Sequence, residues 1–287
     1  MSFDRRLTAA RPDLAAEHLR SAVVAERYAG AVPHCVHAAT TRLWPGPDAS
    51  LAPDTELLLG EAFDVYEIRD GWAWGQSELD GYVGYLRADT LGSGDDHAPT
   101  HRVSVLTGHL YSDATLKLPV QQALPYGARL TVHETRDRHA ELADGLFIPL
   151  PQISSLDHPA PDWVAEAERF LGVGYVWGGR SSWGLDCSAL VQLSRQAAGL
   201  ECPRDSDMQA EGLGETLPEG ADLMRGDLIF WKGHVGIMRD AETLLHANAH
   251  HMAVTTEPLV TAIERIEAAG DGKVTRRARL DEDPNTP

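Results

Sequence analysis

The N-terminal segment carries a thin apolar stripe at helical spacing. Ala15, Leu19 and Ala22 recur every three or four positions after Pro12. Proline is favoured in the first turn of a helix, and residues at this spacing lie on one helix face. The pattern therefore predicts a short N-terminal helix within residues 1–29.

From about residue 30 to residue 156 the pattern changes to short apolar runs separated by turn residues. Two copies of a similar unit lie here, with matching positions 67 residues apart. Repeated short strands between turn signals favour two small β-barrels, over residues 30–94 and 95–156, joined by a linker at residues 92–96. The matched positions are Gly60 and Gly127, Val65 and Val132, Glu67 and Glu134, Arg69 and Arg136, Asp70 and Asp137, and Leu43-Trp44 and Leu110-Tyr111, while Tyr85-Leu86 resembles Phe147-Ile148 after a shorter loop.

After residue 156 helical spacing returns. Asp162 is a good N-cap for a first helix. A glycine-rich stretch over residues 172–179 leads to Cys187 and a second helix, which Gly199 is suited to end. Two helices followed by a sheet predict an α+β domain over residues 157–287. The strands of that sheet are expected over residues 227–231, 234–238 and 243–246.

The charge balance narrows the classes of partner. The chain has 25 Lys and Arg against 43 Asp and Glu, a formal net charge of −18. Nucleic acids and anionic membranes require clustered positive charge, so both are excluded as general partners. An anionic substrate must be held by a few local cations.

Neither a secretory signal nor a membrane span is visible in the sequence. The longest early apolar stretch is residues 22–25, whereas a signal needs roughly 7–15 apolar residues and a span about 20. The three cysteines, Cys35, Cys187 and Cys202, are an odd number without repeating spacing, which argues against a disulfide scaffold. We therefore expect a cytoplasmic protein in which Cys35 and Cys202 serve in packing.

Cys187 is the first candidate for chemistry. It directly precedes the second predicted helix, and a helix N-terminus lowers the pKa of a thiol through its dipole and free N–H groups. Asp186 is the expected cap of this helix, and its charge partly opposes the effect. Taken alone, Cys187 is equally well interpreted as a buried, inert cysteine.

Two histidines strengthen the case for a nucleophile. If the hairpin between the second and third strands turns at Asp240, His234 and His246 face each other directly across the strands. One imidazole would then deprotonate Cys187 and the other would orient it, as in a catalytic triad. Asn248, on the same strand face, is a weaker candidate for the third role.

A metal site is not expected. His246, His250 and His251 lie close together in the sequence, and Cys202 belongs to the same domain. However, the paired-cysteine spacing of a structural zinc site and a His-Glu-x-x-His motif are both missing. The sequence therefore gives no reason to expect a metal or another cofactor.

The C-terminal part of the chain contains five short motifs: Tyr175-Val176-Trp177-Gly178-Gly179, Asp186-Cys187-Ser188, Gly226-Asp227-Leu228, His234-Val235-Gly236-Ile237 and Leu245-His246-Ala247. Together they resemble the NlpC/P60 family of cysteine peptidases, whose catalytic domain has a papain-like core. The resemblance covers residues 162–259 and implies that Cys187, His234 and His246 are catalytic.

Two SH3-like domains before such a domain look like the γ-D-glutamyl-L-diamino acid endopeptidases of the dipeptidyl-peptidase VI type, which process free murein peptides. Pro203-Arg204-Asp205-Ser206 matches their acidic motif, and the resemblance implies that Asp205 and Ser188 hold the free α-amine of L-Ala. A buried ammonium needs a carboxylate and hydrogen-bond acceptors, which would disfavour an acylated N-terminus. Without the motif, Asp205 would be interpreted as a surface turn residue.

The same resemblance implies further substrate contacts. Tyr175 matches a tyrosine beside the nucleophile that would donate a hydrogen bond to the oxyanion or to substrate; the alternative is a core tyrosine. Glu61 and Tyr82 match residues of the first SH3-like domain that close one end of the groove. The position equivalent to Glu61 in the second copy is Ala128, so a structural need shared by both copies does not account for the glutamate. An exposed strand glutamate is the simpler alternative.

Three charged residues complete the substrate-binding candidates. Asp186 lies beside the nucleophile in the sequence. Arg204 or Arg180 would supply the local positive charge that a carboxylate-bearing substrate needs in an acidic protein. If Arg180 has this role, Arg180→Ala should lower the affinity for substrate.

The sequence thus predicts a cytoplasmic cysteine peptidase with an α+β, papain-like catalytic domain after two SH3-like barrels. Its expected reaction is hydrolysis of the γ-D-Glu–diamino acid bond of free murein peptides, such as L-Ala-γ-D-Glu-diamino acid, during cell-wall recycling. The alternatives are an exported hydrolase of intact peptidoglycan and a non-catalytic module that binds wall peptides. An activated Cys187 should react with thiol reagents faster at neutral pH than Cys35 or Cys202.

Overall fold

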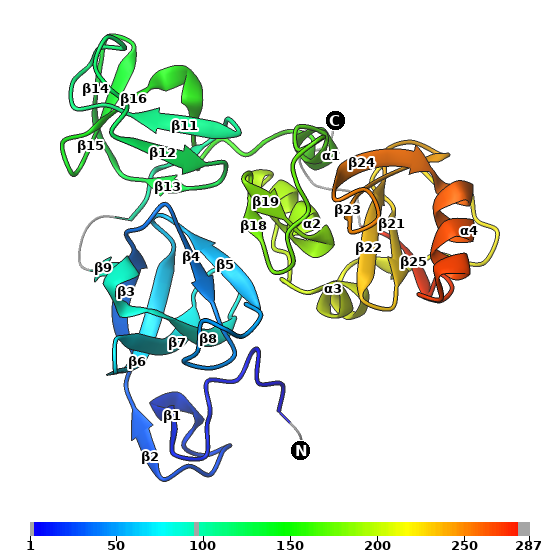
Figure 1. Cartoon of the computed structure of the whole chain (residues 1–287), viewed down its shortest axis with the longest axis horizontal. Coiled ribbons are helices and arrows are strands. Elements are labelled where there is room, and N and C mark those ends of the chain that lie inside the picture. The colour runs from blue at the N-terminus through cyan, green and yellow to red at the C-terminus, as the bar shows by residue number, and fades with distance from the viewer. Residues whose placement is uncertain (1–2, 95–97, 281–287) are drawn as a thin grey trace. The chain divides into compact units, whose positions relative to one another are not determined.

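The computed structural model describes residues 3–94 and 98–280 and contains two compact units, Met1–Asp157 and His158–Pro287 (Figure 1). The first unit is built mainly of short strands, and the second combines helices with a six-stranded sheet. Residues 95 and 96 of the predicted linker lie outside the described ranges.

The N-terminal segment does not form the predicted helix. It forms two short parallel strands, β1 (Leu14–Ala16) and β2 (Arg27–Ala29), with a 3-10 turn at Glu17–Leu19 between them. All three residues of β1 are buried, and the strand packs into the core around Trp74. A run of consecutive buried residues suits a strand covered on both faces. Tertiary packing therefore overrides the weak helical spacing.

The first copy of the repeat forms a five-stranded antiparallel sheet and a separate hairpin. The sheet has the order β8-β7-β6-β3-β9, and the hairpin pairs β4 with β5. The elements are β3 (Val32–Val36), β4 (Thr40–Leu43), β5 (Thr55–Leu58), β6 (Ala62–Arg69), β7 (Trp72–Ser77), β8 (Val83–Arg87), a 3-10 turn (Ala88–Thr90) and β9 (Leu91–Ser93).

The second copy forms three small sheets, with the orders β13-β10-β17, β11-β12 and β14-β15-β16. Its core is aliphatic and includes Val103, Leu124 and Ile148, all fully buried. The elements are β10 (His101–Val103), β11 (Thr107–Leu110), β12 (Gln122–Pro125), β13 (Arg129–Leu130), β14 (Val132–Arg136), β15 (His139–Leu142), β16 (Phe147–Pro149), a 3-10 turn (Leu150–Gln152) and β17 (Ile153–Ser155).

The internal repeat is visible in the backbone. Both copies carry the same irregularities at positions that the sequence comparison matches, which indicates a common local design. In the described part of each copy, however, the strands form separate sheets and not one closed barrel. The shared features are register shifts between Val65 and Glu67 and between Val132 and Glu134, positive φ angles at Asp70 and Asp137, and the isolated bridges Trp44–Tyr85 and Tyr111–Phe147.

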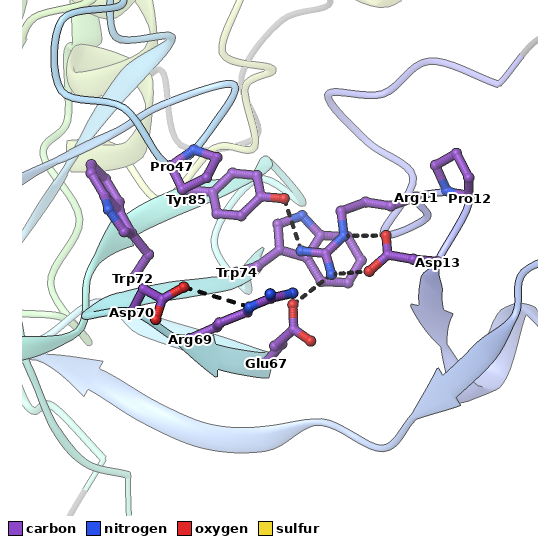
Figure 2. Close-up of a pocket in the computed structure, with 10 residues that line it drawn as sticks. All are labelled: Arg11, Pro12, Asp13, Pro47, Glu67, Arg69, Asp70, Trp72, Trp74 and Tyr85. Carbon is purple, nitrogen blue, oxygen red and sulfur yellow. Dashed lines mark hydrogen bonds and ion pairs between the residues drawn. The ribbon is translucent and has the colours of Figure 1, made fainter.

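Arg11 fastens the N-terminal segment to the first copy (Figure 2). Its guanidinium carbon lies 4.3 Å from the centre of the Trp74 ring, and it donates a 2.8 Å hydrogen bond to the hydroxyl of Tyr85. It also pairs with the carboxylates of Asp13 and Glu67. These residues line an open pocket of about 520 Å³. A cation held between an aromatic face and two carboxylates is favourable, so Arg11 stabilises the position of β1 and β2.

The second unit follows the predicted order of helices and then a sheet (Figure 1). Its sheet has the order β20-β25-β21-β22-β23-β24, and the helix α4 packs on it through Leu259, Ala262 and Ile266. The elements are α1 (Trp163–Glu168), β18 (Arg180–Ser181), β19 (Gly184–Leu185), α2 (Cys187–Ala197), α3 (Ser206–Gly212), β20 (Glu215–Thr216), β21 (Leu228–Trp231), β22 (His234–Met238), β23 (Thr243–Asn248), β24 (Ala253–Pro258), α4 (Leu259–Ala269) and β25 (Arg276–Arg279).

The predicted start of α1 and the predicted end of α2 are confirmed. Asp162 caps α1 by accepting hydrogen bonds from the amides of Val164 and Ala165. Gly199, with φ +77°, follows the C-cap of α2. Only glycine adopts this left-handed backbone without steric cost, which is why the helix ends there.

The predicted register of the β22–β23 hairpin is wrong by two residues. The observed pairs are Ile237 with Leu245 and Met238 with Leu244, which centres the turn one position after Asp240. The Asp240 carboxylate accepts hydrogen bonds from the amides of Glu242 and Thr243, so this residue opens the turn instead of standing at its middle.

Among residues 3–94 and 98–280, no helix has the length and apolar character needed to cross a membrane. Within the same residues, no group of three or more His, Cys, Asp or Glu side chains is arranged to hold a metal ion.

Candidate functional site

Cys187 is the first residue of α2, a helix that is buried along most of its length. Asp186 caps this helix, as predicted, by accepting a 2.9 Å hydrogen bond from the amide of Ala189. The backbone N–H groups of Val235 and Ser188 donate to the sulfur of Cys187. Because Val235 directly follows His234, this contact brings the thiol to the start of β22.

A row of hydrogen bonds crosses three neighbouring strands beside the thiol. Nε2 of His234 lies 2.9 Å from Nδ1 of His246, and Nε2 of His246 lies 2.8 Å from Oε1 of Glu257. Arg265 of α4 donates to both carboxylate oxygens of Glu257. Since its Nε2 is engaged, His234 has Nδ1 to present to Cys187. The arrangement matches a nucleophile, a base and an orienting group.

The two-residue change in register turns the two histidines into diagonal neighbours. With Met238 opposite Leu244, the residue opposite His246 is Gly236, and His234 lies two positions further along the same face. Diagonal side chains remain within reach of long or aromatic residues, and the ring centres are 5.1 Å apart. The pair therefore forms although the predicted direct opposition is wrong.

A buried charged cluster surrounds the capping residue. The carboxylate of Asp186 accepts two hydrogen bonds from Arg204, at 3.0 and 2.7 Å. The hydroxyl of Ser188 donates to Asp186 (3.1 Å) and accepts from Arg204 (2.9 Å). Arg204 is only 1% exposed, so its charge is directed at the N-terminus of α2. A contact of Arg204, Asp186 or Ser188 with substrate stays a prediction.

The thiol and its base are both neutral at rest. Burial, followed by the charge of Asp186, raises the pKa of Cys187 to about 12, which outweighs the two amide donors and Arg204. Burial and the neighbouring His246 lower the pKa of His234 to about 3. The amide of Ser188 at the helix N-terminus does lower the thiol pKa, as predicted, but burial and Asp186 raise it by more. A proton must move from Cys187 to His234 as the sulfur attacks.

Tyr175 lies close to the thiol. Its hydroxyl pKa is raised by burial and then by the nearby Cys187 and Asp186, while Arg204 acts in the opposite direction. Its amide donates a 2.9 Å hydrogen bond to the carbonyl of Met252, which holds the glycine-rich stretch against the start of β24. Its hydrogen bond to substrate stays a prediction.

The remaining substrate-binding candidates from the resemblance are Glu61, Tyr82 and Asp205. Glu61 is 2% exposed and accepts a hydrogen bond from the amide of Leu58, so the alternative of an exposed strand glutamate is wrong. Tyr82, in the same unit, is also buried. Asp205 is the N-cap residue of α3, directly after Arg204. The predicted groove contacts of Glu61 and Tyr82, and the predicted amine contact of Asp205, stay predictions.

Two further candidate site residues, Arg180 and Asn248, form hydrogen bonds with other residues of the second unit. Arg180 is buried and donates hydrogen bonds to Gln192 (2.6 Å) and Gln196 (2.8 Å) of α2, so it ties β18 to that helix. Asn248 accepts hydrogen bonds from the amide and the ring of His251. The orienting position beside His234 is therefore filled by His246.

Glu257 and Arg265 were not found by sequence reasoning. Glu257 lies on β24, where His246 pairs with Thr255, so the glutamate is a diagonal neighbour of His246 on the same face. The sequence does show a charged residue, Glu257, near the end of the strand that follows the one containing His246. It becomes meaningful only when the register between β23 and β24 is known.

Comparison with known families agrees with this geometry. Residues 172–265, which contain the thiol, both histidines and Glu257, match the NlpC/P60 family. The second unit carries an NlpC/P60 domain. The chain is accordingly a cysteine peptidase, a hydrolase. Residues 43–91, ahead of the NlpC/P60 domain, match the bacterial dipeptidyl-peptidase SH3 domain.

Individual relatives extend the match to both units. The chain is 26% identical to a gamma-D-glutamyl-L-lysine dipeptidyl-peptidase of Bacillus cereus, over 72% of this chain and 71% of that protein. A protein of the same name from Bacillus subtilis is 35% identical, over 33% of this chain and 34% of its own length. The crystal structure of an NlpC/P60 family protein from Bacillus cereus has the same fold, with a TM-score of 0.74 and 21% identity, covering 86% of this chain and 99% of that one.

Proposed function

We propose that this NlpC/P60 peptidase hydrolyses the γ-D-Glu–diamino acid bond of free murein peptides that begin with L-Ala. The proposal rests on one combination: the hydrogen-bonded row of His234, His246 and Glu257 beside Cys187 occurs in a chain that also matches the bacterial dipeptidyl-peptidase SH3 domain. The two Bacillus relatives named as gamma-D-glutamyl-L-lysine dipeptidyl-peptidases support the same substrate class.

In the proposed reaction the sulfur of Cys187 attacks the γ-carbonyl of D-Glu while Nδ1 of His234 takes the thiol proton. The carbonyl oxygen gains charge near the Ser188 amide at the N-terminus of α2. His234 then protonates the departing amine of the diamino acid, which leaves a thioester to L-Ala-γ-D-Glu. Water, deprotonated by His234, cleaves the thioester and restores the thiol.

The free α-amine of L-Ala is proposed to bind Asp205 and Ser188. Gln209 of α3 donates hydrogen bonds to the carbonyls of both Ser188 (2.9 Å) and Pro203 (2.8 Å). This link holds the segment that leads to Asp205 beside the nucleophile helix. An ammonium bound by a carboxylate would favour free peptides over chains still attached to the wall. In this proposal both copies of the repeat are SH3-like barrels.

The test is mass-spectrometric digestion of L-Ala-γ-D-Glu-diaminopimelate beside its N-acetylated twin, with the L-Lys peptide in parallel and Cys187→Ala as the inactive control. Cleavage of the free peptides alone, weakened in Asp205→Asn, supports the proposal. Equal cleavage of the acetylated peptide would instead favour a hydrolase of intact peptidoglycan. No cleavage of either peptide would refute this substrate class.

The proposed biological role is recycling of cell-wall peptides in the cytoplasm. Its substrates would be imported free peptides, because the attached wall offers no free L-Ala amine. Cell fractionation followed by immunodetection tests the location. Recovery of the protein outside the cytoplasm would refute the recycling role while leaving the peptide-bond specificity intact.

A further inference from the structure

We propose that Glu257 is a positioning residue: it sets the tautomers of His246 and His234 so that Nδ1 of His234 is free to accept the Cys187 proton. This inference deepens the proposed peptidase function and rests on its thiol chemistry. It does not depend on which peptide is cleaved.

The first step concerns His246. A carboxylate can only accept hydrogen bonds, so Nε2 of His246, 2.8 Å from Glu257, must carry a proton. Burial raises the carboxyl pKa of Glu257, but hydrogen bonds from His246 and Arg265 outweigh it and lower the value to about 2. Glu257 is thus ionised at neutral pH. Arg265 is a donor only, which keeps the carboxylate in its accepting form.

The second step concerns the tautomer of His234, which follows from that of His246. The pKa of His246 is lowered, mainly by burial, so its imidazole is neutral and its Nδ1 is an acceptor once Nε2 holds the proton. Nε2 of His234 must then donate across the 2.9 Å contact to Nδ1 of His246. A neutral His234 with a proton on Nε2 has an unprotonated Nδ1, the atom that the reaction requires.

Without the carboxylate, the contact between the histidines has no preferred direction. Nδ1 of His246 can donate to Nε2 of His234 as well as accept from it. The reversed direction places a proton on Nδ1 of His234, so that this nitrogen cannot accept the proton of the thiol. Glu257 removes this inactive state because the reversed direction would leave its carboxylate facing an unprotonated Nε2.

The sheet explains why a glutamate at this position can act in this way. Thr255 is paired with His246, and Glu257 lies two residues further along the same face of β24. Its side chain is 10% exposed, and that of His246 is completely buried. Water therefore cannot easily replace the carboxylate as an acceptor, and the tautomer depends on Glu257 itself.

The decisive measurement is long-range ¹H–¹⁵N NMR of the imidazole rings in the full chain, with His234→Gln and His246→Gln used for assignment. We expect both rings of the wild-type protein to be neutral, with protonated Nε2 and unprotonated Nδ1. Glu257→Leu, which keeps similar bulk but no acceptor, should lose this single state. Glu257→Gln should retain it, because the donors of Arg265 and His246 both select the amide oxygen.

Peptidase assays give the second readout. We expect kcat to fall about 10²- to 10⁴-fold in Glu257→Leu with little change in KM, and less than about tenfold in Glu257→Gln. Glu267→Gln, an exposed carboxylate on α4, is the matched control and should leave activity and tautomers unchanged. A wild-type His246 with its proton on Nδ1, or a folded Glu257→Leu with wild-type tautomers, would overturn the inference. The NMR result stands even if the chosen peptide is not a substrate.

Discussion

The carboxylate of Asp186 lies 2.7 Å from the guanidinium of Arg204, with the two side chains 11% and 1% exposed. Asp186 caps the helix that begins with Cys187, so a negative charge stands immediately beside the nucleophile. Arg204 balances that charge. The pKa of the Cys187 thiol is therefore lower than it would be if Asp186 had no positively charged partner. The pair therefore serves both the stability of the helix N-terminus and the chemistry of the sulfur.

Arg204→Met should strongly destabilise the second unit. Removing one partner of a buried ion pair leaves an uncompensated charge, which costs about 3–5 kcal/mol. Urea unfolding measures this loss, and Asp186→Asn in the same chain should recover part of it.

Arg225→Met is the matched control for this prediction. Arg225 forms a 2.9 Å ion pair with Asp162, the cap of α1, but the side chains are 36% and 46% exposed. A pair of this exposure contributes at most about 1 kcal/mol. If the two arginine variants lost equal stability, the interpretation of the Arg204 pair as a buried one would be wrong.

The neutral thiol predicts an unusual pH dependence of reactivity. Because the pKa of Cys187 is raised to about 12, its alkylation by iodoacetamide should be slower at pH 7 than that of the more accessible Cys35, and should accelerate with rising pH. This expectation is the opposite of the one drawn from the sequence, in which an activated Cys187 reacts faster at neutral pH than Cys35 or Cys202. Peptide mapping by mass spectrometry resolves the two rates. Fast labelling of Cys187 at pH 7 would indicate a thiolate–imidazolium pair.

Catalysis should persist into acid. The pKa of His234 is lowered to about 3, so this base stays unprotonated well below the ordinary value of 6.5. The acid limb of the kcat/KM profile should therefore lie clearly below pH 6.5. A limb centred near the ordinary imidazole value would contradict the neutral, buried state of His234.

Stability should fall over a related pH window. Because the folded pKa of His234 is depressed, its contribution is complete above the unfolded value of 6.5 and is lost as the pH falls towards 3. The Glu257 contribution is present above 4.5 and is lost as the pH falls towards 2. Between pH 6.5 and 4.5 the decline in the free energy of unfolding is therefore caused mainly by His234.

His234→Gln should flatten this decline, and urea unfolding at pH 7 and pH 5 measures the difference. His250→Gln removes an exposed histidine and should leave the wild-type slope. A His234→Gln protein that loses as much stability as the wild type over this interval would show that other groups govern the acid sensitivity.

Local features of the fold could be predicted from the sequence. The caps at Asp162 and Asp186 and the helix end at Gly199 each depend on a few neighbouring residues, and all three were predicted. Three strands of the second unit, β21, β22 and β23, followed from continuous apolar runs. The repeat was readable because both copies keep the same turn and bulge positions, such as Asp70 and Asp137.

Features that depend on partners distant in the sequence were missed. The N-terminal stripe looked helical, yet β1 is buried on both faces beside Trp74. Glu257 becomes a partner of His246 only through the register of two strands. The raised pKa of Cys187 follows from burial, which the sequence around a cysteine does not report.

The last prediction concerns the contacts of Arg11 with Trp74, Asp13 and Glu67. Arg11→Met keeps the aliphatic stem but removes the cation over Trp74 and the pairs with Asp13 and Glu67. The side chain of Arg11 is 17% exposed, and a partly desolvated cation–π contact contributes up to about 2 kcal/mol. Hydrogen exchange of β1 and β2 should therefore accelerate by one to two orders of magnitude, since each 1.4 kcal/mol is about a factor of ten in the opening equilibrium.

Arg20→Met separates this effect from the mere presence of a cation beside a ring. The Arg20 guanidinium also lies 4.3 Å from an aromatic centre, that of Tyr28, and pairs with Glu17 at 2.7 Å, but its side chain is 59% exposed. Water already solvates that charge, so its loss should leave the exchange of β1 and β2 unchanged. Equal acceleration in the two variants would show that burial of Arg11 is not what holds the N-terminal strands on the first repeat.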